Sequence, residues 1–189
     1  MKLSGSLAIV AALAIVGCRP GAGAAEEPAS PPAAGQTATA FGVAFDHAAG
    51  LQTRPCEADM PRCTILFDPA AEAHMRDLVT IQTHDGALDV VAAAEAGFER
   101  NAEGRLMTTY GRGQPNEVEA FEVNGRSGLR SGVVCGIDDP ETGFHAAAGE
   151  CLWAVVSDGT KSVVISSNGY SSGMEAATAV VDSIRFTTD

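Results

Sequence analysis

The chain has 189 residues, with 12 Lys and Arg against 24 Asp and Glu, which gives a formal net charge of −12 at pH 7. A nucleic-acid-binding protein needs a basic surface to displace phosphate counterions, and no run of Lys or Arg occurs in this sequence, so nucleic acid is disfavoured as a partner. An anionic membrane surface would also repel so acidic a protein, which leaves a lipid as the only expected membrane attachment.

The N-terminus has the features of an export signal. Lys2 precedes an apolar segment at residues 7–17, which is too short to span a bilayer because a spanning helix needs about 20 apolar residues. The segment ends in a sequence that resembles the lipobox of bacterial lipoproteins, namely Ile15, Val16, Gly17 and Cys18. The resemblance implies that residues 1–17 are a signal peptide and that Cys18 becomes the lipidated first residue of the mature protein. The alternative is an ordinary secreted protein with a cysteine beside its cleavage site.

The residues after the lipobox predict a location and a linker. Arg19 stands where lipoproteins retained on the inner membrane typically carry Asp, so the resemblance favours the outer membrane, facing the periplasm, in a Gram-negative cell. In other bacteria it favours the outer face of the cell membrane. Residues 18–40 are rich in Ala, Gly, Pro and Ser, and they predict a flexible linker because they hold too few large apolar side chains for a core. Residues 41–189 then form one domain of ordinary size.

The first half of the domain predicts two strands and two helices. Alternating apolar residues indicate strands at 41–46 and 64–67. Asp68 followed by Pro69 is a typical helix start, and a second helical pattern covers 87–98. The apolar face of the first helix would comprise Ala71, Met75 and Leu78.

The second half predicts mainly paired strands, at 105–110, 118–123, 126–137, 150–156 and 161–166. Asn124-Gly125 and Asp158-Gly159 are typical of two-residue hairpin turns between them. Ser172 and Glu175 form a capping box for a last helix, whose apolar stripe would comprise Met174, Ala177, Val181 and Ile184. The last two strands are apolar on both faces, so other elements must cover both sides of the sheet. The predicted fold class is α+β, with an antiparallel sheet flanked by helices on both faces.

Four cysteines follow Cys18, an even number that predicts two disulfides in an exported chain. Three pairings are possible. We favour Cys56 with Cys63, which are close in one loop, and Cys135 with Cys151, whose strands should place them opposite each other. A redox or metal site at these cysteines is disfavoured, because neither C-x-x-C nor a zinc-ribbon spacing occurs.

No catalytic residue is assigned. Residues 169–173 form a G-x-S-x-G motif between a predicted strand and a predicted helix, as in a nucleophile elbow. An α/β-hydrolase places its histidine after the serine, however, and no histidine follows Ser171. We therefore interpret the motif as a turn with Ser172 as helix cap, and a small hydrolase that uses Ser171 with His145 is the rival hypothesis.

No metal site or cofactor is predicted either. The four histidines, His47, His74, His84 and His145, are scattered without a metal-binding motif. The acidic cluster of Asp138, Asp139 and Glu141 lacks the spacing of a calcium loop. A metal-dependent enzyme at the histidines is a further form of the rival hypothesis.

Two aromatic residues are the candidates for binding. The chain has one Trp and two Tyr. Trp153, on a predicted two-sided strand, is usually a core residue in this setting. If the domain has a ligand groove, however, we predict that Trp153 and Tyr110 line its wall.

The second half of the chain also resembles a known family. A helix at 88–100 is followed by strands, by Val-Asn-Gly at 123–125, by a hairpin, and by a closing helix that ends in Ser-Ile-Arg-Phe at 183–186. This order and these phrases resemble the PsbP-like family, which includes extrinsic photosystem subunits and many bacterial lipoproteins. The disulfides and the 56–63 loop depart from that family's pattern.

The segment from Cys135 to Trp153 also resembles uncharacterised exported proteins of actinobacteria. Both resemblances imply an antiparallel sheet flanked by helices and a role in binding or assembly, and neither supplies a catalytic residue. We therefore expect a membrane-anchored envelope lipoprotein that binds a protein partner or a small ligand without catalysis. A purely structural envelope component is a third possibility.

Overall fold

The computed structural model describes residues 35–111, 114–139 and 143–187, with the backbone alone at 137–139 and 144–148. The elements in chain order are β1 (Gln36–Ala40), β2 (Val43–His47), β3 (Gln52–Pro55), β4 (Cys63–Phe67), the 3₁₀ turn η1 (Ala73–Met75), β5 (Asp77–Asp85), α1 (Leu88–Ala96), β6 (Phe98–Arg100), β7 (Leu106–Thr108), β8 (Glu119–Val123), β9 (Arg126–Asp139), β10 (Phe144–Ser157), β11 (Lys161–Ser167), α2 (Ser171–Ser183) and β12 (Arg185–Phe186). The signal-like segment, Cys18 and most of the predicted linker lie outside the described residues.

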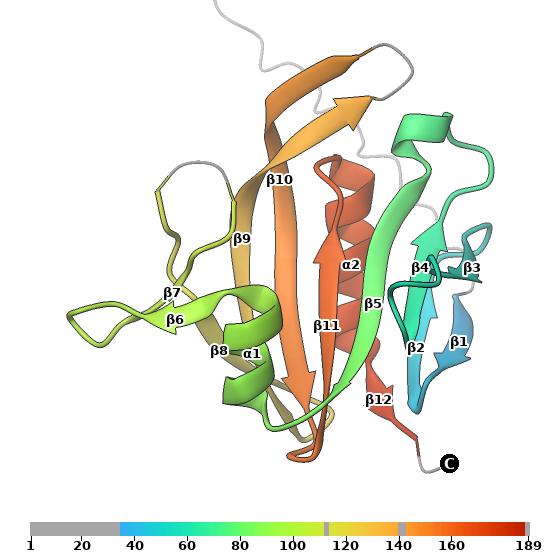
Figure 1. Ribbon diagram of the computed structural model, residues 1–189. Helices are drawn as coiled ribbons and strands as arrows, with labels where there is room; N and C mark the ends of the chain where they lie inside the picture. Colours follow the sequence, from blue (N-terminus) through green and yellow to red (C-terminus); the bar gives the residue numbers. More distant parts are fainter. Residues whose placement is uncertain (1–34, 112–113, 140–142, 188–189) are drawn as a thin grey trace, which may run out of the picture. The chain divides into compact units, whose positions relative to one another are not determined.

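Antiparallel sheets dominate the described domain (Figure 1). The largest has the strand order β3-β4-β5-β11-β10-β9-β8, and a three-stranded sheet has the order β1-β2-β12. β6 and β7 form a separate two-stranded sheet. Two α-helices, α1 and α2, complete the described part of the chain. The predicted α+β class with antiparallel sheets is therefore confirmed.

Helix α2 packs on one face of the seven-stranded sheet. Its residues Ala177, Val180 and Val181 are buried in the same cluster as sheet residues from β10 and β11. Those sheet residues are Ala154, Val156, Val163 and Ile165. β2 contributes Val43 and Phe45 to the same core. Because burying one such side chain contributes about 1.5–3 kcal/mol, this layer carries much of the stability of the domain.

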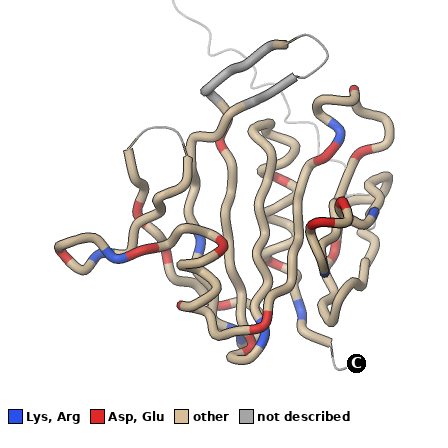
Figure 2. The backbone as a smooth tube through the Cα atoms, viewed as in Figure 1, with Lys and Arg blue, Asp and Glu red and all other residues tan. Residues whose placement is uncertain are grey.

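Helix α1 packs on the opposite face of the same strands. Its buried residues Val91 and Ala92 cluster with Val155 and Val164, the residues that alternate with those facing α2. The expected two-sided burial of these strands is thus confirmed. In keeping with it, Figure 2 shows few charged residues along β10 and β11 and more in the turns and outer strands. Neither described helix is long and apolar enough to cross a membrane.

The domain extends into residues that the sequence assigned to the linker. Strand β1 pairs with β2, so that Gln36 faces His47 and Ala40 faces Val43. The burial of β2, rather than any apolar pattern in β1 itself, accounts for this strand, since the β1 side chains are exposed or half-buried. Composition alone therefore placed the start of the domain too late.

The helix predicted from Asp68 is wrong. Only the single turn η1 forms, and strand β5 begins at Asp77. The Asp68 carboxylate accepts a hydrogen bond from the Ala70 backbone N–H at 2.9 Å, which closes a local turn instead of capping a long helix. The following residues favour a strand between β4 and β11, because four of the five residues at 79–83 are β-branched, namely Val79, Thr80, Ile81 and Thr83.

The capping box predicted for the last helix is also wrong. α2 begins at Ser171, and Tyr170 occupies the N-cap position, so Ser172 lies inside the helix. Asn168 fixes this start, because its Oδ1 accepts the Tyr170 backbone N–H at 3.2 Å and its Nδ2 donates to the Asp77 carbonyl at 2.7 Å. The helix itself is confirmed, and three predicted stripe residues are buried, namely Ala177, Val181 and Ile184.

The two predicted hairpin turns differ. Asn124-Gly125 has positive φ angles of 49° and 72°, as a type I′ turn requires, and this turn is confirmed. The second turn is longer than two residues, because the last pair of β10 and β11 is Ser157 with Ser162. The Asp158 carboxylate organises this longer loop by accepting two backbone N–H groups at 2.9 and 2.8 Å.

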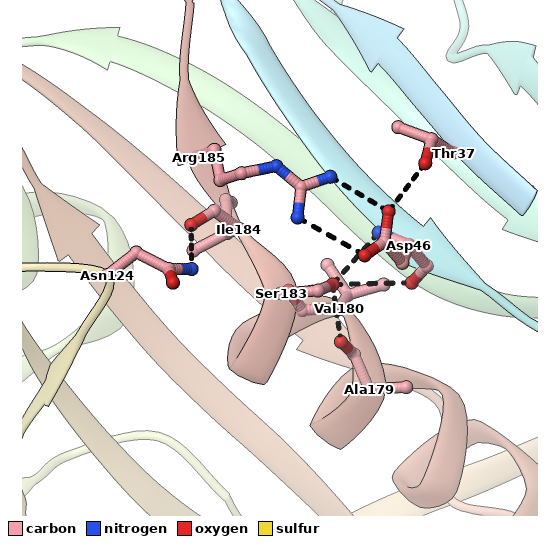
Figure 3. A network of polar contacts seen from close by, with 8 residues as sticks. All are labelled: Thr37, Asp46, Asn124, Ala179, Val180, Ser183, Ile184 and Arg185. Atoms are coloured by element: carbon pink, nitrogen blue, oxygen red, sulfur yellow. Dashed lines mark hydrogen bonds and ion pairs between the residues drawn. The ribbon is translucent and has the colours of Figure 1, made fainter. Parts of the chain in front are cut away.

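A polar network, which we call the clasp, joins the closing strand β12 to β2 (Figure 3). Arg185 donates to both carboxylate oxygens of Asp46, at 2.8 and 3.2 Å, and the Thr37 hydroxyl donates to Asp46 at 2.7 Å. Ser183 Oγ accepts the Asp46 backbone N–H at 2.9 Å. Asn124 donates to the backbone carbonyl just before Arg185, at 3.0 Å. The hydrogen bonds from Arg185 and then Thr37 lower the pKa of Asp46 to about 2.

Candidate functional site

The hairpin of β9 and β10 extends beyond its neighbours in the sheet. β8 pairs with β9 only as far as Arg130, and β11 pairs with β10 only as far as Trp153. The remaining segments, 131–139 and 144–152, pair with each other alone. They form a projecting two-stranded segment, visible at the top of Figure 1, which we call the β9–β10 ribbon. The predicted binding residues gather at its base.

A disulfide crosses the base of the ribbon. Both predicted pairings, Cys56–Cys63 and Cys135–Cys151, are confirmed. The expectation that Cys135 lies opposite Cys151 is wrong in detail, because Cys135 pairs with Gly149 and the disulfide runs diagonally between the strands. This bond fixes β9 relative to β10 at the point where neighbouring strands no longer do so.

Tyr110 and Trp153 lie together at this base. The rings meet edge to face, with centroids 5.0 Å apart and an interplanar angle of 64°, an arrangement that aromatic pairs favour. Tyr110 is 41% exposed, and Trp153 is half-buried. They line an open groove of about 470 Å³, whose other lining residues are Glu95, Gly111, Val133, Cys135 and Gly136. The structure thus brings the two predicted residues into one groove, and ligand binding there stays a prediction.

The end of α1 positions the Tyr110 ring. The Thr109 backbone N–H donates to the Gly97 carbonyl at 2.8 Å, and the Tyr110 N–H donates to Thr108 Oγ1 at 3.1 Å. Gly97 ends α1 with a φ of 61°, a left-handed conformation that favours glycine. A Cβ atom there would lie 2.6 Å from Thr109 Oγ1 and 3.1 Å from Tyr110 Cδ1. Gly97 therefore serves both the helix end and the placement of the ring.

A close approach of two backbones forms the other wall of the groove. Gly111, with a φ of 101°, comes so near β9 that an added Cβ would lie 3.0 Å from Val133 Cβ. Asn116 Nδ2 donates to the Gly132 carbonyl at 2.5 Å, which ties the segment after this loop to the same strand. The loop that carries Tyr110 is therefore held against the ribbon rather than free in solvent.

One carboxylate lines the groove among the described residues, that of Glu95 on α1. Its Oε1 lies 3.6 Å from His84 Nδ1 on β5, and the two side chains are 45% and 17% exposed. His84 Nε2 is buried, and no described residue hydrogen-bonds to it. Glu95 can accept a hydrogen bond from a basic or N–H group of a ligand, while the two rings offer an apolar surface. This combination suits recognition of an apolar group beside a cation.

The serine of the G-x-S-x-G motif lies elsewhere. Ser171 is exposed at the first position of α2 and lines a separate cavity of about 540 Å³ with Gly169, Met174 and Glu150. Among the described residues, Ser171 has no hydrogen bond to a histidine or carboxylate that could activate it. The side chain of His145, the proposed base, lies outside the described side chains, so the hydrolase hypothesis is untested.

The described histidines lie in three different surroundings. His47 contacts the Ala48 carbonyl, His74 lies 3.8 Å from Glu72, and His84 lies beside Glu95. No group of three or more His, Cys, Asp or Glu side chains that could hold a metal occurs within the described part of the chain. The acidic cluster at 138–141 lies outside the described side chains.

Comparison with known proteins assigns no family. No family model matches the chain, and no curated protein matches it. A crystal structure of a protein from Bacteroides thetaiotaomicron VPI-5482 is similar, with a TM-score of 0.48 and 6% identity. The similarity covers 78% of this chain and only 46% of that protein. The solution structure of cyanobacterial PsbP (CyanoP) from Synechocystis sp. PCC 6803 is similar with a TM-score of 0.46 and 9% identity, covering 86% of this chain and 98% of CyanoP. At these scores neither similarity supports a function.

Proposed function

We propose that this protein is an exported lipoprotein, anchored through Cys18, whose domain binds a protein partner at the cell envelope through the groove of Tyr110 and Trp153. The observation that carries the proposal is the meeting of these two rings at an open groove, in a chain with one Trp and two Tyr. Tyr and Trp are enriched at protein interfaces because each combines a large apolar surface with a polar tip.

The openness of the groove favours a protein segment over a small molecule. Small-ligand sites bury about 70–90% of the ligand surface, whereas this groove is open to solvent. The adjoining β9–β10 ribbon adds surface that a macromolecule can contact. The Glu95 carboxylate favours a partner segment in which an apolar side chain is followed by Lys or Arg. A small apolar ligand is the alternative occupant.

The proposed location rests on two features. Disulfides persist in oxidising compartments, and the domain has two. The lipobox-like sequence supplies the anchor, because two or three acyl chains hold a protein at a membrane far more firmly than one. We therefore place the protein on the outer membrane, facing the periplasm, in a Gram-negative cell, and on the outer face of the cell membrane otherwise.

Affinity purification from detergent-solubilised envelopes tests the proposal. The tagged full-length chain is compared with Tyr110→Ala and with a matched control, Met60→Ala, because Tyr110 and Met60 are 41% and 38% exposed and only the former lines the groove. We expect one stoichiometric partner with the wild type and with Met60→Ala, and a recovery at least about tenfold lower with Tyr110→Ala.

Two outcomes would contradict this proposal. Equal recovery of the partner with all three chains would place the interface elsewhere. Recovery of no protein, together with a small apolar molecule that co-purifies with the wild type and not with Tyr110→Ala, would assign the groove to a small ligand. A Cys18→Ala chain, purified alongside, tests the anchor separately, because it should appear in the soluble fraction.

A further inference from the structure

Asn-Gly occurs twice in the chain, at residues 124–125 and 168–169. Asparagine is one of the chemically least stable residues. It deamidates fastest before glycine, because a following residue without a side chain does not hinder attack by its own backbone nitrogen on the asparagine Cγ. The two dipeptides are identical, so the folded structure decides which of them can react.

The second dipeptide is held on both sides. Asn168 Nδ2 donates to the Asp77 carbonyl at 2.7 Å, and its Oδ1 accepts the Tyr170 backbone N–H at 3.2 Å. Gly169 is packed against the β9–β10 ribbon so closely that a Cβ at Gly149 would lie 2.6 Å from Gly169 Cα. The Asn168 side chain and the Gly169 nitrogen therefore cannot approach each other without breaking two hydrogen bonds and a close backbone contact.

The first dipeptide is open to solvent. Asn124 is exposed at the turn between β8 and β9, and its Nδ2 donates to the Ile184 carbonyl at 3.0 Å (Figure 3). Within the described part of the chain, Asn124 Oδ1 and the Gly125 N–H have no hydrogen-bond partner. A Cβ at Gly125 would meet nothing within 4 Å. Attack at Asn124 therefore requires only that one side-chain hydrogen bond breaks and that an exposed turn relaxes.

We propose that Asn124 is a site of spontaneous deamidation, and that this modification opens the clasp. The Gly125 nitrogen attacks Asn124 Cγ, the Cγ–Nδ2 bond breaks, and the proton of the Gly125 N–H leaves with the amide group as ammonia. The product is a five-membered succinimide. Water then hydrolyses either of its two carbonyl–nitrogen bonds, which restores the N–H and leaves an aspartate or an isoaspartate at position 124. This site is independent of the groove proposed above.

The modification removes a donor from the clasp. In both products an ionised carboxylate replaces the amide, and because it can only accept, it repels the Ile184 carbonyl oxygen instead of bonding to it. Isoaspartate also adds one carbon atom to the backbone of the turn. Ile184 lies directly before Arg185, which bonds to Asp46. Deamidation of Asn124 therefore loosens the closing segment where the β8–β9 hairpin holds it.

The test follows the full-length protein in detergent as it ages at mildly alkaline pH. Peptide mapping by mass spectrometry measures deamidation at both dipeptides, and isoaspartyl methyltransferase with labelled S-adenosylmethionine detects isoaspartate. We expect Asn124 to react at least about tenfold faster than Asn168, because one further hydrogen bond that must break slows a step by up to about tenfold and the close contact at Gly169 adds to this. In the urea-unfolded chain the two rates should be similar, because these contacts are lost.

Three outcomes would overturn the site. Equal rates in the folded protein would mean that both dipeptides react only from the unfolded chain. Faster reaction of Asn168 would contradict the protection by its two hydrogen bonds. No reaction of Asn124 in the time that the unfolded chain takes to react would mean that the folded turn does not permit the attack.

Asn124→Asp reproduces one product and tests the effect on the clasp. Asn101→Asp is the matched control, because the described hydrogen bonds of the Asn101 side chain use only Oδ1, which accepts the Glu103 and Arg105 N–H groups, and aspartate keeps that acceptor. We expect Asn124→Asp to unfold at a lower urea concentration than the wild type, and Asn101→Asp to shift the midpoint less than about half as much. Equal shifts would reduce the effect to the added negative charge, and an unchanged midpoint for Asn124→Asp would contradict the opening of the clasp.

Discussion

The clasp and the groove are two regions of the domain that use their polar and aromatic residues differently. In the clasp, Thr37 and Arg185 donate to the Asp46 carboxylate, Ser183 accepts the Asp46 backbone N–H, and Asn124 donates to the backbone of the closing segment. In the groove, Tyr110 and Glu95 keep much of their surface exposed. The phrases Val-Asn-Gly and Ser-Ile-Arg-Phe meet in the clasp. These two segments therefore stabilise the closure of the domain, and the candidate binding residues lie in neither of them.

The largest expected effect on stability lies at the base of the groove. Replacing Cys135 and Cys151 together by Ser removes the bond that closes the longer loop, with a sequence separation of 16 against 7 for Cys56 and Cys63. The chain-entropy model gives a loss of about 3 kcal/mol in the free energy of unfolding, against about 2.5 kcal/mol for the other pair. Urea unfolding of both double variants measures this. A larger loss for the 56–63 pair would contradict the role of the second disulfide as the staple of the ribbon.

The next effect tests the contact between the ribbon and the turn before α2. A Cβ at Gly149 would lie 2.5 Å from the Gly169 carbonyl oxygen, a backbone atom that cannot move aside easily. Gly149→Ala should therefore cost about 2 kcal/mol. Gly132→Ala on the same ribbon is the control, because a Cβ there meets nothing within 4 Å. Similar unfolding midpoints for the two variants would mean that the ribbon moves freely against that turn.

A smaller effect is expected in the clasp. Ser183→Ala removes the acceptor of the part-buried Asp46 N–H and should cost about 1 kcal/mol in urea unfolding. Ser172→Ala, an exposed position on the same helix, should change stability by less than about 0.5 kcal/mol. If the two variants were equally stable, the hydrogen bond to β2 would contribute nothing to closure.

The clasp also predicts a pH dependence. The folded-state pKa of Asp46 is lowered from 3.8 to about 2, so the unfolded chain binds a proton more readily in that range. The contribution of Asp46 is present above about pH 4 and is lost as the pH falls through about 2. The free energy of unfolding of Asp46→Asn should therefore fall less steeply between these two pH values than that of the wild type. If the free energy of unfolding of the two chains changed with pH in parallel, the lowered pKa of Asp46 would be contradicted.

The smallest effect on stability is expected at Tyr110. Because the ring is 41% exposed, Tyr110→Ala should change the free energy of unfolding by only about 0.5 kcal/mol while it removes the proposed partner. Thermal unfolding measures the first quantity and affinity purification the second. A large loss of stability would mean that the Tyr110 ring stabilises the core. It would then contradict the view that the groove, unlike the clasp, leaves its residues free for a partner.

The sequence predicted those parts of the fold that depend on residues close to one another in the chain. The two-sided strands β10 and β11, the Asn124-Gly125 turn and the disulfide pairs all follow from neighbouring residues and were confirmed. The helix after Asp68 was wrong because helical spacing of a few apolar residues competes with pairing to distant strands, which the sequence does not display. β1 was missed for the same reason, since its partner β2 supplies the burial.

The site was predicted only in part. Tyr110 and Trp153 were predicted because aromatic residues are scarce in the chain, and the structure places both in one groove, while ligand binding there stays a prediction. Gly97 and Gly111 were missed as parts of the wall, because their role depends on how closely the Tyr110 loop approaches α1 and β9. A glycine directly after a helical pattern, as at Gly97, was a signal of a left-handed helix end, but nothing in the sequence indicated which ring would lie against it.

The most direct measurement of the central claim is photocrosslinking in intact cells with p-benzoylphenylalanine in place of Tyr110. Met60, 38% exposed and outside the groove, provides the control position. We predict one discrete crosslinked protein at position 110, absent at position 60 and lost when a Cys18→Ala chain is used. No crosslink at position 110, or the same crosslinked proteins at both positions, would contradict a partner-binding groove at Tyr110 and Trp153.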